Sequence, residues 1–210
     1  VSLAGFQKAT VANTICDPSV SDALAAKPID PPTLAVTFSV NDSPYAGQEG
    51  DKVTSRMIRD RLLREAEGNV AIQVVETADG NGYEVAGRGE LQLGVLIETM
   101  RREGYEMSIS RPRVVYRTDP DTGARIEPIE EVVIDVDEEY SGVVVEKLSA
   151  RRSELVEMRP SGGGKQRLVF HAPSRALIGY HGEFLTDTRG TGVMNRVFHA
   201  YEPDRGAIEG

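Results

Sequence analysis

Tryptophan is absent from this chain of 210 residues, and cysteine occurs once, at Cys16. A single cysteine cannot form a disulfide within the chain, which suits a reducing cytosol. The sequence also lacks any apolar run near the roughly 20 residues that a membrane-spanning helix needs, and it has no charged-then-apolar secretory leader. We therefore expect no membrane partner. Because the chain begins at Val1 rather than at methionine, we expect a fragment of a longer protein.

Residues that could carry catalysis or hold a metal are also scarce. The three histidines, His171, His181 and His199, are far apart and lack the spacing of a metal site. Cys16 has no histidine or basic residue close by in the sequence that would activate it as a nucleophile. The acidic run from Glu130 to Glu139 is more typical of a solvated edge and a helix start than of an acid–base pair. We therefore predict no catalytic residue and no metal ligand.

Two glycine-rich stretches resemble phosphate-binding loops only in part. After SGGGK, which ends at Lys165, a phosphate-binding loop requires Ser or Thr and then a helix, but Gln166 follows and a strand-like run continues. A flexible hairpin loop is the prediction here. In GRGELQ the dinucleotide fingerprint fails because Gln92 occupies the place of its third glycine. We therefore predict no cofactor-binding residue in this chain.

Acidic residues outnumber basic ones by 33 to 24, which gives a formal net charge of −9. A chain adapted to general nucleic-acid binding would instead be strongly basic. Any contact with RNA must therefore use local basic patches, with the acidic faces turned away from phosphate.

Residues 1–30 indicate the end of another domain. VSLAG and KATVANTIC predict short strands, which are not stable as a pair in water, and the Pro-rich AAKPIDPP predicts a linker. Residues 31–117 then predict a βαββαβ unit, the ferredoxin-like arrangement. Its expected elements are strand 33–40, helix 51–68, strands 70–75 and 82–86, a helix from Leu91 that Gly104 ends, and a strand over 105–109.

A linker is predicted over residues 118–126, followed by a second βαββαβ unit over residues 127–210. The run Val143-Val144-Val145 favours a strand by propensity, but Leu148 follows at helical spacing, so we predict a helix. The expected elements are strand 129–136, helix 141–153, strands 155–158 and 166–172, a mixed turn and helix over 174–190, and strand 193–201. The fold class is therefore α+β.

Basic residues gather at two places that could contact phosphate. Four arginines lie along the helix of residues 51–68, but acidic residues lie among them and favour a solvated face. Arg111, Arg113 and Arg117 have no acid between them, and alternation places all three on one side of an extended segment. Since a guanidinium binds phosphate through two N–H groups, these three are the better candidates for contact with phosphate or a partner.

The stretch RALIGYHGEFLTDTRGTG, from Arg175 to Gly192, is rich in Gly, Thr and paired hydrophobic residues. Its residues alone favour a turn, a helix cap and core positions. It also resembles the RGLIGYR…FLTxTxGxG signature of the TypA/BipA family of elongation-factor-G-like translational GTPases. Ala176 and His181 depart from that pattern, in which Gly and Arg are found, and the second change removes a permanent charge from a helix-side contact with RNA or a partner.

The resemblance covers nearly the whole chain, because NDSPYAGQEGDKVTSR, GRGELQL, RPRVVYR and EPIEEVVIDVDEEYSG occur in the family's order. It implies two ferredoxin-like domains, similar to the third and fifth domains of elongation factor G, preceded by the last strands of the β-barrel second domain. It also implies a cytoplasmic, ribosome-associated bacterial GTPase as the parent protein, linked to stress adaptation and ribosome assembly. GTP and Mg²⁺ would bind in the parent before Val1, so the chain itself is expected to be no enzyme and to need no cofactor.

We therefore expect the chain to dock on the ribosome, on rRNA and ribosomal proteins, and to relay the nucleotide state of the parent. The alternative is a regulatory module in which the paired ferredoxin-like domains bind a small molecule between them. The sequence leaves the oligomeric state open. The candidate contact residues are Arg111, Arg113, Arg117, Lys165, Arg175, His181 and Arg189.

Overall fold

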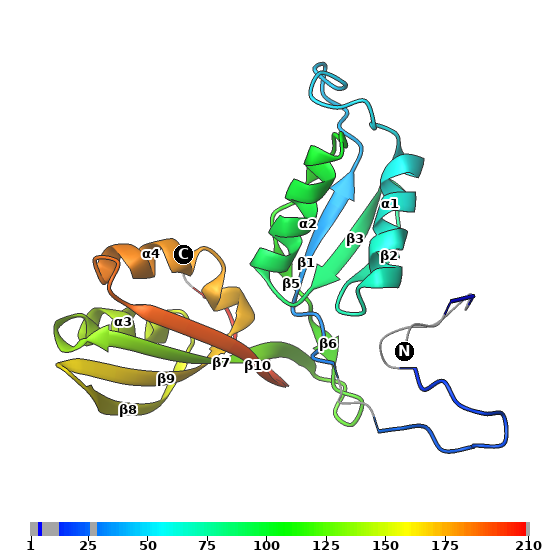
Figure 1. Ribbon diagram of the computed structural model, residues 1–210. Coiled ribbons are helices and arrows are strands. Elements are labelled where there is room, and N and C mark those ends of the chain that lie inside the picture. The colour runs from blue at the N-terminus through cyan, green and yellow to red at the C-terminus, as the bar shows by residue number, and fades with distance from the viewer. Residues whose placement is uncertain (1–3, 6–12, 26–28, 209–210) are drawn as a thin grey trace. The chain divides into compact units, whose positions relative to one another are not determined.

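The computed structural model describes residues 4–5, 13–25 and 29–208. The chain divides into two compact units, Val1–Arg111 and Pro112–Gly210 (Figure 1). Among the described residues, no helix is long and apolar enough to cross a membrane.

The segment before residue 30 contains no strand in the parts that are described, residues 4–5, 13–25 and 29. Its one regular feature is a turn at Asp17, whose carboxylate accepts hydrogen bonds from the backbone N–H and the hydroxyl of Ser19. The strands predicted for VSLAG and KATVANTIC fall largely outside the described residues, whereas of the linker AAKPIDPP only residues 26–28 do, and the rest of it has no helix or strand.

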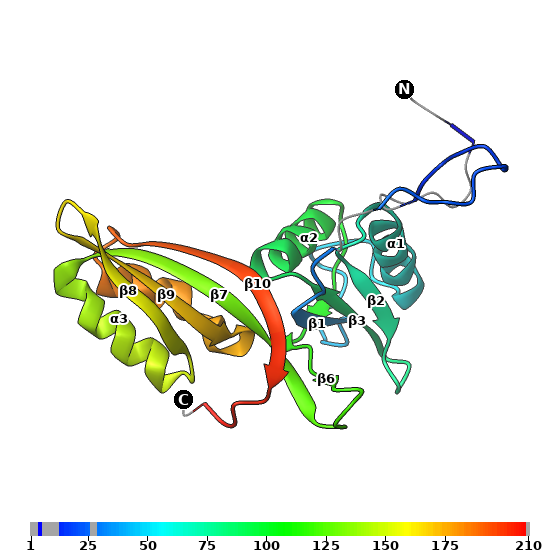
Figure 2. The same cartoon turned by 90° about the horizontal axis from the view of Figure 1, so that it is seen from below.

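The first unit contains an antiparallel sheet with both helices on one face (Figure 2). The strand order is β2-β3-β1-β4, which is the ferredoxin-like order for a βαββαβ chain. The elements are β1 (Leu34–Ser39), α1 (Ser55–Gly68), β2 (Gln73–Glu76), β3 (Gly82–Gly87), α2 (Glu90–Arg102) and β4 (Ser108–Ile109).

Both helices of the first unit bury side chains of the apolar faces that the sequence predicts. On α1, Ile58 and Leu62 are fully buried, and Thr54 caps the helix by accepting a hydrogen bond from the N–H of Met57. On α2, the buried side chains recur at helical spacing and face β1 and β3. Gly104, at φ +87°, ends α2 in the left-handed conformation that glycine adopts without strain.

The last strand of the first unit is shorter than the predicted 105–109. The backbone N–H of Tyr105 donates to the carbonyl of Met100 at the end of α2, so it is not available to a sheet. Glu106 is buried, and its carboxylate accepts the N–H groups of Gly47 and Glu49 and the side-chain amide of Asn41. This carboxylate therefore holds the turn-rich loop that precedes α1, and regular pairing begins only at Ser108.

The second unit has the same topology, with strand order β10-β7-β9-β8. Its buried cluster joins alternate residues of β7 and β9 to both helices, so α3 and α4 pack on one face of the sheet. The elements are β5 (Arg113–Val114), β6 (Arg117–Thr118), β7 (Arg125–Asp137), α3 (Glu138–Ala150), β8 (Glu154–Gly162), β9 (Lys165–Pro173), the 3₁₀ helix η1 (Ser174–Leu177), α4 (Tyr180–Asp187) and β10 (Val193–Pro203).

The linker predicted over 118–126 is instead a hairpin of the second unit. Strand β6 pairs with the start of β7, and Asp119 closes the loop through hydrogen bonds with Ala124 and Gly123. The loop therefore belongs to the second sheet, and the boundary between the compact units falls after Arg111. Sequence composition could not distinguish a linker from a hairpin turn here, because a polar Asp/Gly-rich segment is typical of both.

Helix α3 confirms the prediction of a helix, rather than a strand, at Val143-Val144-Val145. Val144 and Leu148 are fully buried and four residues apart on one face, which outweighs the strand propensity of three successive valines. Glu138 and Glu139 occupy the first turn, where carboxylates suit the positive end of the helix dipole.

Candidate functional site

The three arginines of the segment Arg111–Arg117 are all exposed, but the boundary between the units divides them. Arg111 belongs to the first unit, whereas Arg113 and Arg117 lie on β5 and β6 of the second. The guanidinium of Arg117 lies over the ring of Tyr201, 4.4 Å from its centroid. This cation–π contact holds the side chain of Arg117 against the sheet.

Lys165 and Arg189 lie at the same end of the second unit, which we call the basic end. Lys165 Nζ lies 3.0 Å from Asp137 Oδ1, and the hydroxyl of Thr191 donates to Asp137 Oδ2 at 2.8 Å. Asp137 therefore joins the start of β9 to the turn that carries Arg189. The hydrogen bond from Thr191 and the charge of Lys165 both lower the pKa of Asp137.

The glycine-rich loop at the basic end is the predicted hairpin. Gly162, Gly163 and Gly164 all have positive φ, and β9 follows rather than a helix. The carbonyl of Gly164 accepts the first N–H of α3, from Glu138, at 3.0 Å. Because this loop presents no helix N-terminus of its own, it lacks the geometry of a nucleotide phosphate cradle.

Arg189 occupies a strained turn between α4 and β10. Its φ of +50° is unusual for a residue other than glycine, and hydrogen bonds from Gly190 to Leu185 and from Thr191 to Thr188 hold the turn. The side chain is exposed, and within the described part of the chain it makes no ion pair. Arg189 therefore presents its charge to solvent, whereas the charge of Lys165 is partly balanced by Asp137.

Arg175 has a different role from the one expected of it. Its guanidinium donates two hydrogen bonds to Glu127, whose side chain is fully buried, and further ones to the carbonyl of Gly206 and to Asp204. The backbone N–H of Arg205 also donates to Glu127, at 2.8 Å. Hydrogen bonding to Glu127 raises the pKa of Arg175. The residue joins η1, β7 and the end of β10, so its charge is not available to a partner.

His181 lies exposed in the first turn of α4. Helix α4 packs through Tyr180 and Phe184, which are fully buried, and ion pairs with α3 hold its other side. His181 is therefore on the solvent side of the helix, where a contact with a partner is sterically possible.

Two of the histidines, which are far apart in the sequence, lie side by side in the structure. The rings of His171 and His199 stack with their centroids 4.0 Å apart. Glu131 lies beside them, and its carboxylate is 4.0 Å from Nε2 of His171. Antiparallel pairing of β7 with both β9 and β10 creates this cluster, and spacing along the sequence carries no trace of it.

The arginines of α1 are largely engaged with carboxylates, as the sequence indicated. Arg61 bonds to Glu103 at 2.7 Å and to Glu65 at 3.0 Å, and Arg56 and Arg59 lie near Asp60. The ion pairs are therefore solvated at Arg56 and Arg59, whereas the side chain of Arg61 is largely buried.

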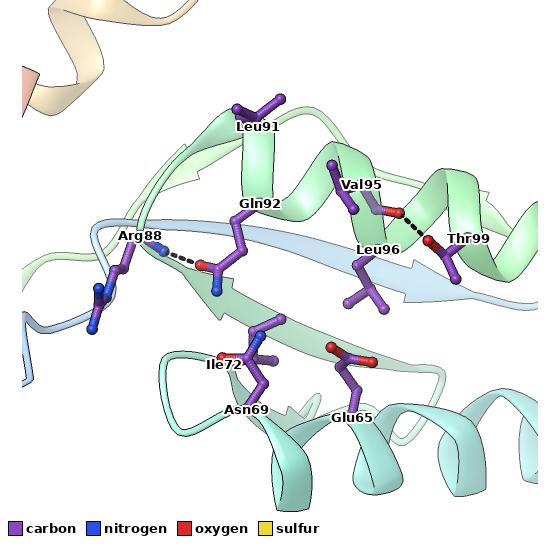
Figure 3. A pocket seen from close by; sticks show the side chains of 9 residues that line it. All are labelled: Glu65, Asn69, Ile72, Arg88, Leu91, Gln92, Val95, Leu96 and Thr99. Carbon is purple, nitrogen blue, oxygen red and sulfur yellow. Dashed lines mark hydrogen bonds between the residues drawn. The ribbon is translucent and has the colours of Figure 1, made fainter. Parts of the chain in front are cut away.

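A groove of about 480 Å³ runs between α1 and α2 of the first unit (Figure 3). The nearly buried side chains of Ile72 and Leu96 point into it, and Leu91 at its edge is 81% exposed. Side chains of α1 and α2 and of the residues next to them form the rest of the lining, namely Glu65, Asn69, Arg88, Gln92, Val95 and Thr99. Gln92 is already engaged, because its side chain accepts the N–H of Arg88 at 2.8 Å.

Comparison with known families matches residues 124–209 to the model described as Elongation factor G C-terminus. These residues span β7 to β10, the ferredoxin-like core of the second unit. The two ferredoxin-like units and this match define the class of the chain as elongation-factor-G-like.

Three relatives named Large ribosomal subunit assembly factor BipA are similar along almost the whole chain. The protein of Synechocystis is 48% identical over 100% of the chain, that of Haemophilus influenzae 48% over 98%, and that of Bacillus subtilis 46% over 97%. The chain covers 35%, 33% and 33% of these proteins, respectively. The chain thus belongs to the BipA family and spans about a third of the length of its relatives.

Sequence reasoning identified the cations of the basic end but missed the residues that position them. Asp137 and Thr191 were predicted only as part of a helix start and a turn, and their contact depends on how β9 and β10 flank β7. A detectable signal was the clustering of Gly, Thr and Arg in TRGTG, which is typical of a turn whose backbone is fixed by side-chain hydroxyls.

Proposed function

We propose that this chain is the ribosome-docking region of a TypA/BipA-type translational GTPase that acts in assembly of the large ribosomal subunit. The observation that carries this proposal is the 46–48% identity, along almost the whole chain, to proteins named for large-subunit assembly. The rest of the parent protein binds GTP and Mg²⁺ and hydrolyses the nucleotide, in the cytoplasm, and its action supports adaptation to stress.

The docking surface consists of exposed cations on an otherwise acidic chain. Arg111, Arg113 and Arg189 are exposed, and Lys165 is joined through Asp137 to Thr191 in the turn that carries Arg189. Since the net charge of −9 repels phosphate, these local cations make the contacts with rRNA, and His181 adds a contact with RNA or ribosomal protein. Arg175 and Arg117 support the fold of the surface rather than the contact, because Glu127 and Tyr201 hold them.

The chain also relays the nucleotide state of the parent to the ribosome. Each unit has its own ferredoxin-like set of strands and helices, so each can move as a body when the rest of the parent changes conformation. Differential contact of the units with the ribosome in the two nucleotide states would supply the coupling free energy.

Charge reversal tests the docking surface. Two double variants, Arg111→Glu with Arg113→Glu and Lys165→Glu with Arg189→Glu, are compared with the wild-type chain by co-sedimentation with purified large ribosomal subunits. Each phosphate contact that is lost should weaken binding and reduce the slope of log K against log salt by about 1.

The matched control is Arg102→Glu, since Arg102 lies at the exposed end of α2 with its side chain 76% exposed. It changes the net charge in the same direction, so a purely global charge effect would weaken binding per substitution as much as the docking variants do. Wild-type binding by both double variants would remove these residues from the docking surface.

A second candidate function, the binding of a small molecule, is favoured by the groove of Figure 3. This groove lies within the first unit, not between the two units as the sequence-based alternative assumed. A ligand that binds only the native state raises the thermal midpoint, so a thermal-shift screen tests the idea. The variant Val95→Glu places a charge in the lining and should abolish a shift that arises from this groove.

A further inference from the structure

The sheet of the second unit has one face that the helices leave open. Val132, Ile134 and Phe170 point to the helices within the core cluster, so their neighbours along the strands point the other way. Glu131 on β7 and His171 on β9 are such neighbours, and they are direct partners in the antiparallel ladder. Both side chains therefore lie on the open face, next to each other.

Strand β10 lies on the other side of β7 from β9 (Figure 2). His199 on β10 reaches the same face, because its ring stacks on that of His171. The ladder between β10 and β7 is regular up to Phe198 and resumes at Ala200, so His199 is the extra residue of a β-bulge. A β-bulge changes the direction in which a side chain points. Here the imidazole of His199 extends over β7 and stacks on the imidazole of His171, with an angle of 26° between the ring planes.

The three side chains form a compact donor set. One nitrogen from each histidine and one carboxylate oxygen of Glu131 all lie within 4.8 Å of one another. Zinc binds imidazole nitrogen at about 2.0–2.1 Å and carboxylate oxygen at about 2.0–2.2 Å, so two donors on one tetrahedral ion are about 3.4 Å apart. Small rotations of the exposed His199 and the half-exposed Glu131 cover the difference.

The surroundings favour a cation at this place. Arg205 donates to the carbonyl of His171, and its charge is balanced by ion pairs with Glu202 at 2.9 Å and Glu154 at 3.7 Å. Glu154, the other ladder partner of His171, is one of these two partners of Arg205 and lies exposed at the edge of the sheet. The net charge of −9 also raises the local concentration of cations.

From this geometry we propose that Glu131, His171 and His199 bind a divalent transition-metal ion of the zinc class on the open face of the second sheet. Two imidazoles and a carboxylate are a donor set that zinc accepts, and three protein ligands leave one coordination position for water or a donor from a partner. The ion fastens the bulge of β10 to β7 and β9. This site is independent of the basic end and of the proposed docking function.

The test uses the whole chain with Cys16→Ser, because Cys16 is an exposed thiol that would bind zinc by itself. Titration calorimetry with Zn²⁺ should show one ion per chain, and Zn²⁺ but not Mg²⁺ should raise the thermal midpoint. His199→Ala and Glu131→Gln should each weaken binding at least about ten-fold.

The matched control is His181→Ala, which removes an exposed histidine of the same unit outside the cluster. It should leave the affinity unchanged. Cobalt substitution supplies a second readout, since the absorption bands of bound Co²⁺ should disappear in His199→Ala, whose fold is checked by circular dichroism. The proposal is overturned if the chain binds no Zn²⁺, or if His181→Ala weakens binding as much as His199→Ala does.

Discussion

At the scale of single residues, Arg175 and Arg189 have opposite roles although both lie in the same glycine- and threonine-rich stretch. Arg175 is bound to the fully buried Glu127, and Arg189 presents its guanidinium to solvent. A buried carboxylate that loses its partner costs far more than an exposed cation does, so the two positions should differ sharply in their effect on stability.

We predict that Arg175→Ala lowers the free energy of unfolding of the second unit by about 3–5 kcal/mol, because Glu127 then remains buried without its main partner. Denaturant unfolding measures this change. Arg189→Ala is the control and should stay within about 0.5 kcal/mol of wild type. Equal losses in the two variants would contradict the buried role of Arg175.

Glu106 predicts a pH effect in the first unit. Hydrogen bonds from the N–H groups of Glu49 and Gly47 hold the pKa of Glu106 below its ordinary value. The unfolded chain therefore takes up this proton first as the pH falls. The stabilising contribution of the Glu106 carboxylate is complete above about pH 4.3, the ordinary pKa of Glu. It is lost as the pH falls through the lower pKa that Glu106 has in the folded protein.

Accordingly, Glu106→Gln should unfold with a free energy that falls less steeply than that of wild type between about pH 6 and about pH 3. Chemical denaturation at several pH values measures the two slopes. Identical slopes would show that the charge of Glu106 does not hold the loop before α1.

At the scale of elements, the spacing of apolar residues predicted the helices whose apolar faces are buried in the structure. The spacing of Leu93, Leu96 and Met100 placed α2, and Leu148 correctly outweighed the valine run in α3. Strand ends and the linker were less predictable, because a carboxylate such as Glu106 or a turn such as that at Asp119 decides them through contacts with distant backbone groups. The pairing of His171 with His199 depends on strand register and could not be derived from spacing.

Two glycines of the second unit provide a prediction with opposite signs. Gly142 is exposed inside α3, and an added Cβ would meet nothing within 4 Å. Gly142→Ala should therefore stabilise the unit by about 0.4–1 kcal/mol. Gly179, just before α4, has φ +72°, so Gly179→Ala should destabilise it by about 1 kcal/mol or more. Thermal or denaturant unfolding of the two variants compares them, and a loss in Gly142→Ala would contradict the helix assignment.

At the scale of the whole molecule, the chain consists of two units that each repeat the ferredoxin-like topology. The core cluster of the second unit draws all its members from β7, α3, β9, η1 and α4. Because no side chain of the first unit takes part in this cluster, the second unit has the core that independent folding requires.

We therefore predict that residues 112–210 alone form a folded, cooperatively unfolding protein. Circular dichroism and a dispersed proton–nitrogen NMR spectrum check this. A spectrum typical of an unfolded chain would mean that the first unit is needed to complete the second.

The central claim is that exposed cations of this acidic chain dock it on ribosomal RNA, and one measurement tests it most directly. The wild-type chain is sedimented with purified large ribosomal subunits over a series of salt concentrations. If Arg111, Arg113, Lys165 and Arg189 each contact a phosphate, the chain binds at low salt and log K falls with log salt with a slope of about −3 to −4. Absence of binding at low salt, or binding that salt does not weaken, would contradict the account.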